Sequence, residues 1–492
     1  MDKQIPTDNL TEKQKDYATF LPAMSSFFAR DLGKARHEED YIKPERVPQN
    51  FEHGVEGLNY IKSKDTYFYY KWHLYSAGHA DLNMKKFSVR DDIIRNRDRN
   101  DNWLLGDSGG FQIGKGVWEG DWKDPNCPKA KKKREQVLEF MDHNMDYGMI
   151  LDIPAWVSRS PQGAKASNIN SYQEAVDGTR INNDYFMKNR NGNCKFLNVL
   201  QGENFQQADD WYTQMKDYCD PKKYPSTHFN GWAMGGQNMC DIHLALKRLV
   251  ALRFDGLLEK GKHDVMHFLG TSKLEWAVLL TDVQRAIRKY HNENFMITFD
   301  CASPFLASAN GQVYTDIEIK DKAKWVYRMM ASADDKGFAK ETKAFKDAVL
   351  EKGIFPAFRD SPVSARWMLK DITCYNPGDL NKMGNDPKTS WDSFSYTLQM
   401  AHNVWMHITA VQEANQMYDK GINPKMLVQE QFDRIAFRDI VNAVFATSSR
   451  DEANAVIEEF QRFWMSIIGT RGATGKKTVN ASTQFQNLFE EV

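Results

Sequence analysis

The sequence has few cysteines, and none of them forms the close pairs that bind metals or build compact disulfide frameworks. Six cysteines occur in 492 residues, and no two have the spacing of a CxxC motif. They are widely separated, at Cys127, Cys194, Cys219, Cys240, Cys301 and Cys374. We therefore expect reduced, mostly buried thiols and no cysteine-based metal site.

Long hydrophobic runs and a net charge are also lacking. No early apolar stretch has the length of a signal-peptide core, and no later run reaches membrane-spanning length. The formal net charge is −1, so no overall basic excess indicates nucleic acid, and any such surface must be local. With 41% hydrophobic and 27% charged residues, we expect an ordinary folded protein of the cytoplasm with no membrane partner.

Short apolar runs alternate with longer helical patterns from about residue 100 onward. Predicted buried strands are 103–105, 149–151, 196–200, 232–234, 265–269 and 295–299, and the region 67–74 is a candidate first strand. Stretches with helical spacing, such as 135–145, 206–215 and 242–252, lie between them. This alternation predicts the α/β class and a (β/α)8 TIM barrel, in which the chemistry gathers where strands end.

The pattern divides the chain into a barrel and additions to it. After residue 315 the segments 320–331 and 340–351 have helical spacing, a strong helix is expected over 394–417, and 426–468 has the pattern of a helical tail. We expect five regions: an N-terminal extension (1–60), the main part of the barrel (61–319), an insertion (320–392), a closing barrel helix (393–418) and a C-terminal helical extension (419–492).

Polar residues that suit glycosyl chemistry follow the predicted strands. Three of these strands lead into carboxylates, at Asp107, Asp152 and Asp300, while Gln201 and the Gly235–Gly236 pair follow two others. Each alone can be a helix cap or a glycine turn. If the barrel brings them together, one acid can attack a sugar carbon while another handles the proton of the leaving group. The amide and the bare glycine backbone suit the edge of a purine.

The strand ends resemble, in order and spacing, the signature segments of the queuine and archaeosine tRNA-guanine transglycosylases. The resemblance covers Trp103 to Thr315 continuously, and the helix carrying His402-Asn403 resembles the one that closes the family's barrel. The matching segments are DSGGFQ at 107–112, the Asp152 strand, LQG at 200–202, AMGG at 233–236, LGT at 269–271, FDC at 299–301 and NGQVYT at 310–315.

The resemblance implies a role for each of these residues. Asp300 would be the nucleophile that holds the sugar covalently, and Asp107 the general acid/base acting on the departing and arriving bases. The exchange would be ping-pong and would need no cofactor. The implied substrate-binding residues are Ser108, Gly109, Gly110, Phe111, Asp152, Gln201, Gly235, Gly236 and His267, with Phe111 stacking on the base and Asp152 and Gln201 reading its edge.

The sequence departs from the tRNA enzymes in one important respect. Their zinc subdomain is built from a close cysteine cluster and a histidine, whereas only Cys374 lies between Cys301 and the predicted closing helix. No metal is therefore expected, and the 320–392 insertion takes the place of that subdomain.

This departure favours a related branch, in bacteria and phages, that inserts 7-deazaguanines into DNA. The expected partners are DNA rather than tRNA, and the free 7-deazaguanine base. A phage-encoded enzyme would act in the host cytoplasm. The oligomeric state stays open, with a homodimer as one alternative. A tRNA-guanine transglycosylase without the zinc site, and a glycoside hydrolase, are the rival functions.

A local basic run precedes the Asp152 strand. It comprises Lys129, Lys131, Lys132, Lys133 and Arg134, and we expect it to bind nucleic-acid phosphates. The alternative is a solvated helix start, which is about as common. His79 follows the candidate first strand and is a weaker candidate for the same site.

Overall fold

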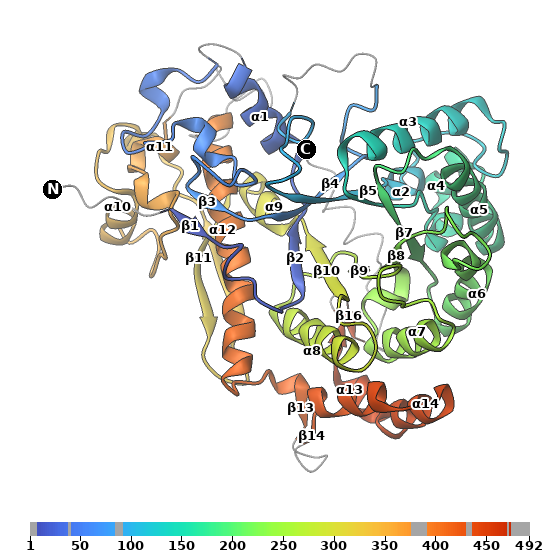
Figure 1. Cartoon of the computed structure of the whole chain (residues 1–492). Helices are drawn as coiled ribbons and strands as arrows, with labels where there is room; N and C mark the ends of the chain where they lie inside the picture. Colours follow the sequence, from blue (N-terminus) through green and yellow to red (C-terminus); the bar gives the residue numbers. More distant parts are fainter. Residues whose placement is uncertain are drawn as a thin grey trace.

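The computed structural model of the chain describes residues 7–37, 41–83, 92–374, 391–429, 435–469 and 472–473. Its centre is an eight-stranded parallel sheet in the order β2-β10-β9-β8-β7-β6-β5-β4 (Figure 1). The strands are β2 (Thr19–Pro22), β4 (Trp72–Ser76), β5 (Trp103–Asp107), β6 (Tyr147–Met149), β7 (Lys195–Leu200), β8 (Gly231–Met234), β9 (Val265–Phe268) and β10 (Met296–Cys301).

The two outer strands of this sheet approach each other and nearly close it into a barrel. A parallel bridge joins Ala23, just after β2, to Leu74 in β4, and the Met24 N–H donates to the Leu74 carbonyl at 2.9 Å. The predicted α/β barrel of the TIM type is therefore confirmed.

The first strand of the barrel lies earlier than the sequence suggested. β2 is the four-residue segment Thr-Phe-Leu-Pro, wholly buried, and it lies within 1–60, the range expected as an N-terminal extension. Nearby, β1 (Asp8–Asn9) pairs with β3 (Phe68–Tyr69). The candidate first strand at 67–74 overlaps β4, which is the second barrel strand in chain order. A strand this short, ended by a proline, has no periodicity that distinguishes it from a loop.

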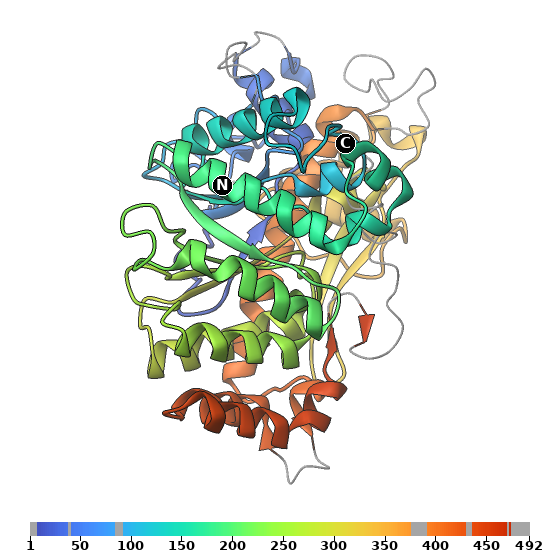
Figure 2. The same cartoon turned by 90° about the vertical axis from the view of Figure 1, so that its right-hand side faces the viewer.

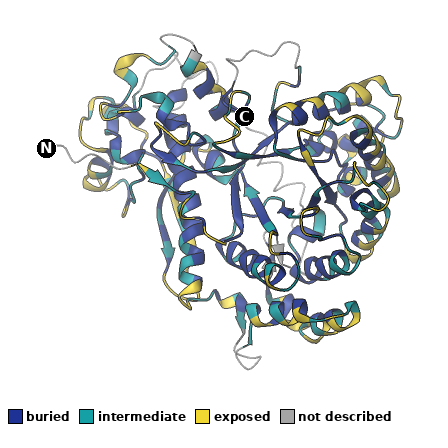
Figure 3. Cartoon of the chain, viewed as in Figure 1, coloured by how far each residue is buried: buried dark blue, intermediate teal, exposed yellow. Residues whose placement is uncertain are grey.

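Helices cover the outside of the barrel, and several begin at side-chain caps. Ser171, Asn204 and Asp241 accept hydrogen bonds from backbone N–H groups in the first turns of α5, α6 and α7. Figure 3 shows that the strands and inner helix faces are buried while the outer turns are exposed. The helices are α1 (Ser26–His37), α2 (Gly110–Gly114), α3 (Pro128–Asn144), α4 (Pro161–Ser167), α5 (Tyr172–Asn189), α6 (Phe205–Met215), α7 (Ile242–Phe254), α8 (Leu274–Tyr290) and α9 (Ser303–Ala309).

The insertion begins with a hairpin rather than a helix. β11 (Gln312–Ile319) pairs antiparallel with β12 (Trp325–Ala331), so the helix predicted over 320–331 is wrong. The run Trp-Val-Tyr is rich in strand-forming residues, and pairing with β11 outweighs its weak helical spacing. The helix predicted over 340–351 is present as α10 (Phe345–Glu351), and α11 (Leu369–Ile372) follows it. Residues 375–390 of the insertion lie outside the described residues.

The insertion packs on the long closing helix. This helix, α12 (Ser393–Asp419), matches the predicted 394–417 closely. Phe358 of the insertion stacks on His402 with ring centroids 5.2 Å apart, and His402 Nε2 lies 2.8 Å from the Tyr314 carbonyl oxygen. The HN pair of α12 is therefore structural, because the amide of Asn403 also contacts backbone at Pro304 and Gln312.

The C-terminal extension is helical, as predicted, but the part of it that the structure describes contains three short helices rather than one long one. They are α13 (Phe437–Ala446), α14 (Arg450–Glu459) and α15 (Gln461–Ser466), which lie beneath α7 and α8 in both views (Figures 1 and 2). Two small hairpins accompany them: β13 (Val428–Gln429) with β14 (Ile435–Ala436), and β15 (Ile468–Gly469) with β16 (Gly472–Ala473). Residues 430–434, 470–471 and 474–492 lie outside the described residues. No helix in the described ranges is long and apolar enough to cross a membrane.

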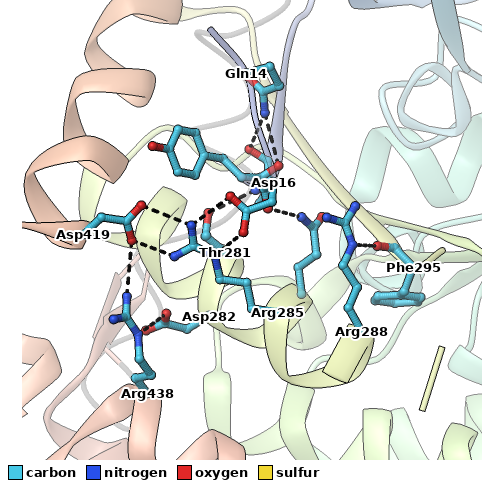
Figure 4. A network of polar contacts seen from close by, with 12 residues as sticks. Gln14, Asp16, Thr281, Asp282, Arg285, Arg288, Phe295, Asp419 and Arg438 are labelled. Atoms are coloured by element: carbon cyan, nitrogen blue, oxygen red, sulfur yellow. Dashed lines mark hydrogen bonds and ion pairs between the residues drawn. The ribbon is translucent and has the colours of Figure 1, made fainter. Parts of the chain in front are cut away.

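A network of charged side chains fastens this extension to the barrel (Figure 4). Arg285 of α8 bridges Asp16 and Asp419, with Nε–Oδ2 and Nη1–Oδ1 distances of 2.7 Å. Arg438 of α13 donates to the buried Asp282 of α8 at 2.8 Å. The N-terminal segment, α8, α12 and α13 are thus held by one set of contacts.

Candidate active site

Three aspartates lie at the carboxyl ends of the barrel strands. Asp107 is the last residue of β5, Asp300 is the fifth residue of β10, and Asp152 comes three residues after β6 ends. Because the strands are parallel, their carboxyl ends meet at one face of the barrel, where the active sites of such folds occur.

Strand alternation directs Asp107 and Asp300 toward the inside of the barrel. A Cβ on Gly106 would lie 2.3 Å from the Met141 sulfur of α3, so Gly106 faces outward and its neighbour Asp107 faces inward. On β10, Phe299 packs beside Phe20, which stacks on His407 of the outer helix α12. Asp300 therefore points the other way, into the barrel.

Asp300 is held in place through one of its two oxygens. Its Oδ1 accepts a hydrogen bond from the Gly270 N–H at 2.7 Å and lies 3.2 Å from His267 Nε2. The side chain is 13% exposed, so it is oriented yet still accessible.

Asp107 is partly buried and has a perturbed pKa. Burial raises the pKa of its carboxyl above the ordinary value, and the neighbouring Asp300 charge raises it further. A hydrogen bond from the Ser76 hydroxyl at 2.6 Å opposes this by stabilising the carboxylate. A carboxyl with its pKa moved toward neutrality is suited to take up and release protons.

Asp152 and Gln201 form a hydrogen-bonded pair beside Asp107. Gln201 Nε2 donates to Asp152 Oδ2 at 2.8 Å. Burial raises the pKa of Asp152 to about 7, and the Asp107 charge adds to the effect. The carboxyl and the amide together present both acceptors and donors, as the edge of a purine requires.

Glycines allow the backbone to approach this pair closely. A Cβ on Gly110 would lie 2.3 Å from the Asp152 carbonyl oxygen. One on Gly235 would lie 2.8 Å from Gln201 Nε2, and Gly236 has a φ of +55°, which disfavours other residues. The fold therefore brings Gly235 and Gly236 to Gln201, and Gly110 to Asp152.

Ser108 and Phe111 lie in the same segment with different surroundings. The Ser108 hydroxyl is buried and has no hydrogen-bond partner in the part of the chain that the structure describes. Buried polar atoms are rarely left unpaired, so a ligand is a natural partner for this one. Phe111 is half-buried, with its ring 5.6 Å from that of Trp156 and the Lys115 ammonium 5.4 Å from its centroid.

The basic run divides into exposed lysines and a buried arginine. Lys131 and Lys132 are exposed, Lys129 pairs with Glu119 at 2.8 Å, and the Lys133 ammonium lies 5.0 Å from the centre of the Trp118 ring. A Cβ on Gly109 would lie 2.6 Å from Trp118, so Trp118 links Lys133 to the DSGG segment.

Arg134, by contrast, is 1% exposed. Its Nε donates to the Asn182 side chain at 2.6 Å, and its guanidinium lies near the rings of Trp122 and Tyr185. The structure thus separates Arg134, which stabilises the helical layer, from the exposed lysines of the run.

Three contacts of the site were not predicted. Ser76 bonds to Asp107, Gly270 bonds to Asp300 and Thr298 bonds to His267, and in each case the partner belongs to the neighbouring strand. Ser76 lies in the segment Ser-Ala-Gly-His whose last residue, His79, was noted for this site. Burial lowers the pKa of His79 while the nearby Asp107 charge raises it, so His79 does lie close to Asp107.

Comparison with known proteins gives no family for the chain. No protein-family model matches it, and no curated protein matches it significantly. Among the described residues, no group of three or more histidine, cysteine and acidic side chains has the arrangement of a metal site.

Proposed function

We propose that this protein is a guanine transglycosylase that exchanges guanine in DNA for a 7-deazaguanine through a covalent glycosyl-aspartate at Asp300. One observation gives the proposal its main support. Asp300, an anchored carboxylate, lies close enough to the partly buried Asp107 for its charge to raise the pKa of that group. Glycosyl transfer with retention needs such a pair, one acid to attack carbon and one to manage protons.

The two half-reactions follow from the contacts of these aspartates. Both hydrogen bonds on Asp300 go to Oδ1, so Oδ2 attacks C1′ of the target nucleotide. The bond from C1′ to guanine N9 breaks, and Asp107 donates the proton that the leaving base requires. The incoming base then gives a proton to Asp107, its N9 attacks C1′, and the bond to Asp300 breaks.

Recognition of the base is assigned to the Asp152–Gln201 pair and its glycine surroundings. The pKa near 7 allows Asp152 to act as an acceptor or a donor at neutral pH. Ser108 supplies a free hydroxyl, and the Gly235–Gly236 backbone lies beside Gln201. An analogue lacking the matching groups would leave these buried polar atoms unpaired, which is a strong source of discrimination.

The preference for DNA rests on the sequence and on the exposed lysines. The chain lacks the cysteine cluster of the tRNA enzymes that it resembles. Lys131 and Lys132 are exposed near the start of α3, and their neighbour Lys133 contacts Trp118, which packs against Gly109 of the DSGG segment, so a phosphate backbone can be bound near that segment. The target nucleotide must leave its stack before Asp300 can reach the sugar.

Incorporation of labelled base tests the proposal. Purified protein is incubated with radiolabelled guanine and either duplex DNA, single-stranded DNA or unmodified tRNA, and label in the polymer is measured. Incorporation into DNA is expected, and its loss in Asp300→Asn is the matched control. Incorporation into tRNA alone supports the zinc-free tRNA enzyme instead. Release of sugar from a simple glycoside, with no label in either polymer, supports a hydrolase.

A further inference from the structure

His267 lies between Thr298 and Asp300 because of the register of two neighbouring strands. In the parallel pair β9–β10, His267 is opposite Thr298, and Asp300 is two residues further along β10. Residues two apart on a strand share a face, so the imidazole faces both side chains. Its Nδ1 lies 2.9 Å from the Thr298 hydroxyl and its Nε2 lies 3.2 Å from Asp300 Oδ1.

The imidazole has no nitrogen left for a substrate. His267 is 0% exposed, and both ring nitrogens are already in hydrogen bonds within the barrel. This differs from the implied role of His267 as a residue lining the base site. Its effect on the reaction must pass through Asp300.

The direction of the bond to Asp300 follows from chemistry. An ionised carboxylate only accepts hydrogen bonds, so Nε2 must carry the hydrogen that points to Oδ1. The Thr298 hydroxyl can rotate to suit Nδ1, and it thereby fixes the orientation of the ring. Together with the Gly270 N–H, this places two donors on Oδ1 and leaves Oδ2 as the attacking atom.

We propose that His267, oriented by Thr298, is a positioning residue that holds Asp300 for attack and selects which of its oxygens bonds to the sugar. This inference rests on the proposed function of Asp300. A well-oriented hydrogen bond to a charged group is worth enough that its loss is expected to slow the chemical step about 10- to 100-fold.

Two pairs of variants test the role of the donors. His267→Gln keeps an N–H donor, whereas His267→Met fills similar space without one; Thr298→Ser keeps the hydroxyl, whereas Thr298→Val removes it. We expect Met and Val to lower kcat for base exchange with KM nearly unchanged, and Gln and Ser to restore most of it. His263→Met is the matched control. His263 is as buried as His267, lies two residues before β9 begins, and bonds to the Cys219 carbonyl.

A second measurement does not depend on activity. Nitrogen-15 NMR of histidine in the full chain should give the His267 Nε2 signal of a hydrogen-bonded N–H, and Asp300→Asn should shift it more than any other histidine signal. An unchanged signal in Asp300→Asn, or equal kcat values for His267→Met and His267→Gln, would overturn the inference. If the wild-type protein exchanges no base at all, the proposed function of Asp300 fails, while the NMR result still decides whether His267 holds its carboxylate.

Discussion

At the scale of single residues, three aspartates of one site have different environments. Asp300 is anchored by backbone and imidazole donors, Asp107 is partly buried and accepts from the Ser76 hydroxyl and the Gly109 N–H, and Asp152 is buried with one amide donor. Burial raises the pKa of Asp107 and of Asp152, for which it reaches about 7. In the proposed reaction, these differences in environment would allow one residue type to serve as nucleophile, acid/base and base reader.

The raised pKa of Asp152 predicts a pH-dependent stability. Below pH 4 the carboxyl holds a proton in both the folded and unfolded states, and between about 4 and 7 only the folded protein retains it. The free energy of unfolding therefore falls as pH rises through this window, by up to about 1.4 kcal/mol per pH unit, and stays at the lower level above it. Asp152→Asn should remove this component, as urea denaturation at pH 5, 6, 7 and 8 will measure.

The free energies of unfolding of the wild type and of Asp152→Asn are compared at each pH. The free energy of unfolding of Asp152→Asn should rise relative to that of the wild type as pH rises from 5 to 8. A difference that is constant with pH would contradict the raised pKa of this carboxyl.

Ser76 predicts a shift in the pH dependence of activity. Its hydroxyl bond lowers the pKa of Asp107 against the effect of burial, so Ser76→Ala should raise that pKa further. The limb of the pH–rate profile for base exchange that belongs to Asp107 should move to higher pH. Asp107→Asn should lack this limb. A profile that does not move in Ser76→Ala would show that Ser76 does not influence proton transfer by Asp107.

At the scale of elements, strand ends were easier to predict from sequence than pairing partners. The runs before Asp107, Gln201 and Asp300 end at polar residues and are strands as predicted. β2 and β12 were missed, because their identity depends on pairing with segments distant in sequence. The same reason explains why the contacts of Ser76 and Thr298 could not be anticipated from their own segments.

The joint between α8, α12 and α13 is formed by the polar contacts of Asp282, Arg285 and Arg438. Substitution in this joint should destabilise the protein more than loss of an exposed ion pair. Asp282 is 2% exposed and accepts from Tyr418, which is 3% exposed, so Asp282→Ala leaves a buried hydroxyl unpaired. Asp282→Ala also removes the bond from Arg438, and we expect a loss of about 1–3 kcal/mol in the free energy of unfolding by urea. Glu119→Ala removes an exposed pair and should change it by no more than about 0.5 kcal/mol.

A double variant distinguishes the unpaired hydroxyl from loss of packing. Asp282→Ala with Tyr418→Phe should destabilise less than the sum of the two single changes, because no buried hydroxyl then remains. Strict additivity would show that the hydrogen bond at this joint contributes little.

At the scale of the whole molecule, the barrel could be predicted because strands and helices alternate repeatedly along the chain. The exposure of individual charged side chains could not be predicted. The basic run Lys129 to Arg134 is uniform in sequence, yet packing buries Arg134 on Asn182 and leaves Lys131 and Lys132 exposed. Exposure of a charged residue depends on tertiary neighbours that a run of like charges does not reveal.

The position of these lysines predicts a salt-dependent effect on DNA binding. Lys131→Ala with Lys132→Ala should weaken DNA affinity and reduce the slope of log affinity against log salt by up to about 2, since each phosphate contact contributes about 0.9. Lys222→Ala with Lys223→Ala is the control, because those lysines lie in the loop before β8, at the amino ends of the strands. Equal slopes for both double variants would show that Lys131 and Lys132 do not contact DNA.

The most direct test of the central claim is to trap the intermediate and locate its bond. Protein incubated with DNA is quenched in acid during turnover, digested, and analysed by mass spectrometry for a peptide that carries a nucleotide without its base. We predict that the peptide containing Asp300 carries it, and that Asp300→Asn forms none. Base exchange that proceeds without any such adduct, or an adduct on a different residue, would contradict the account.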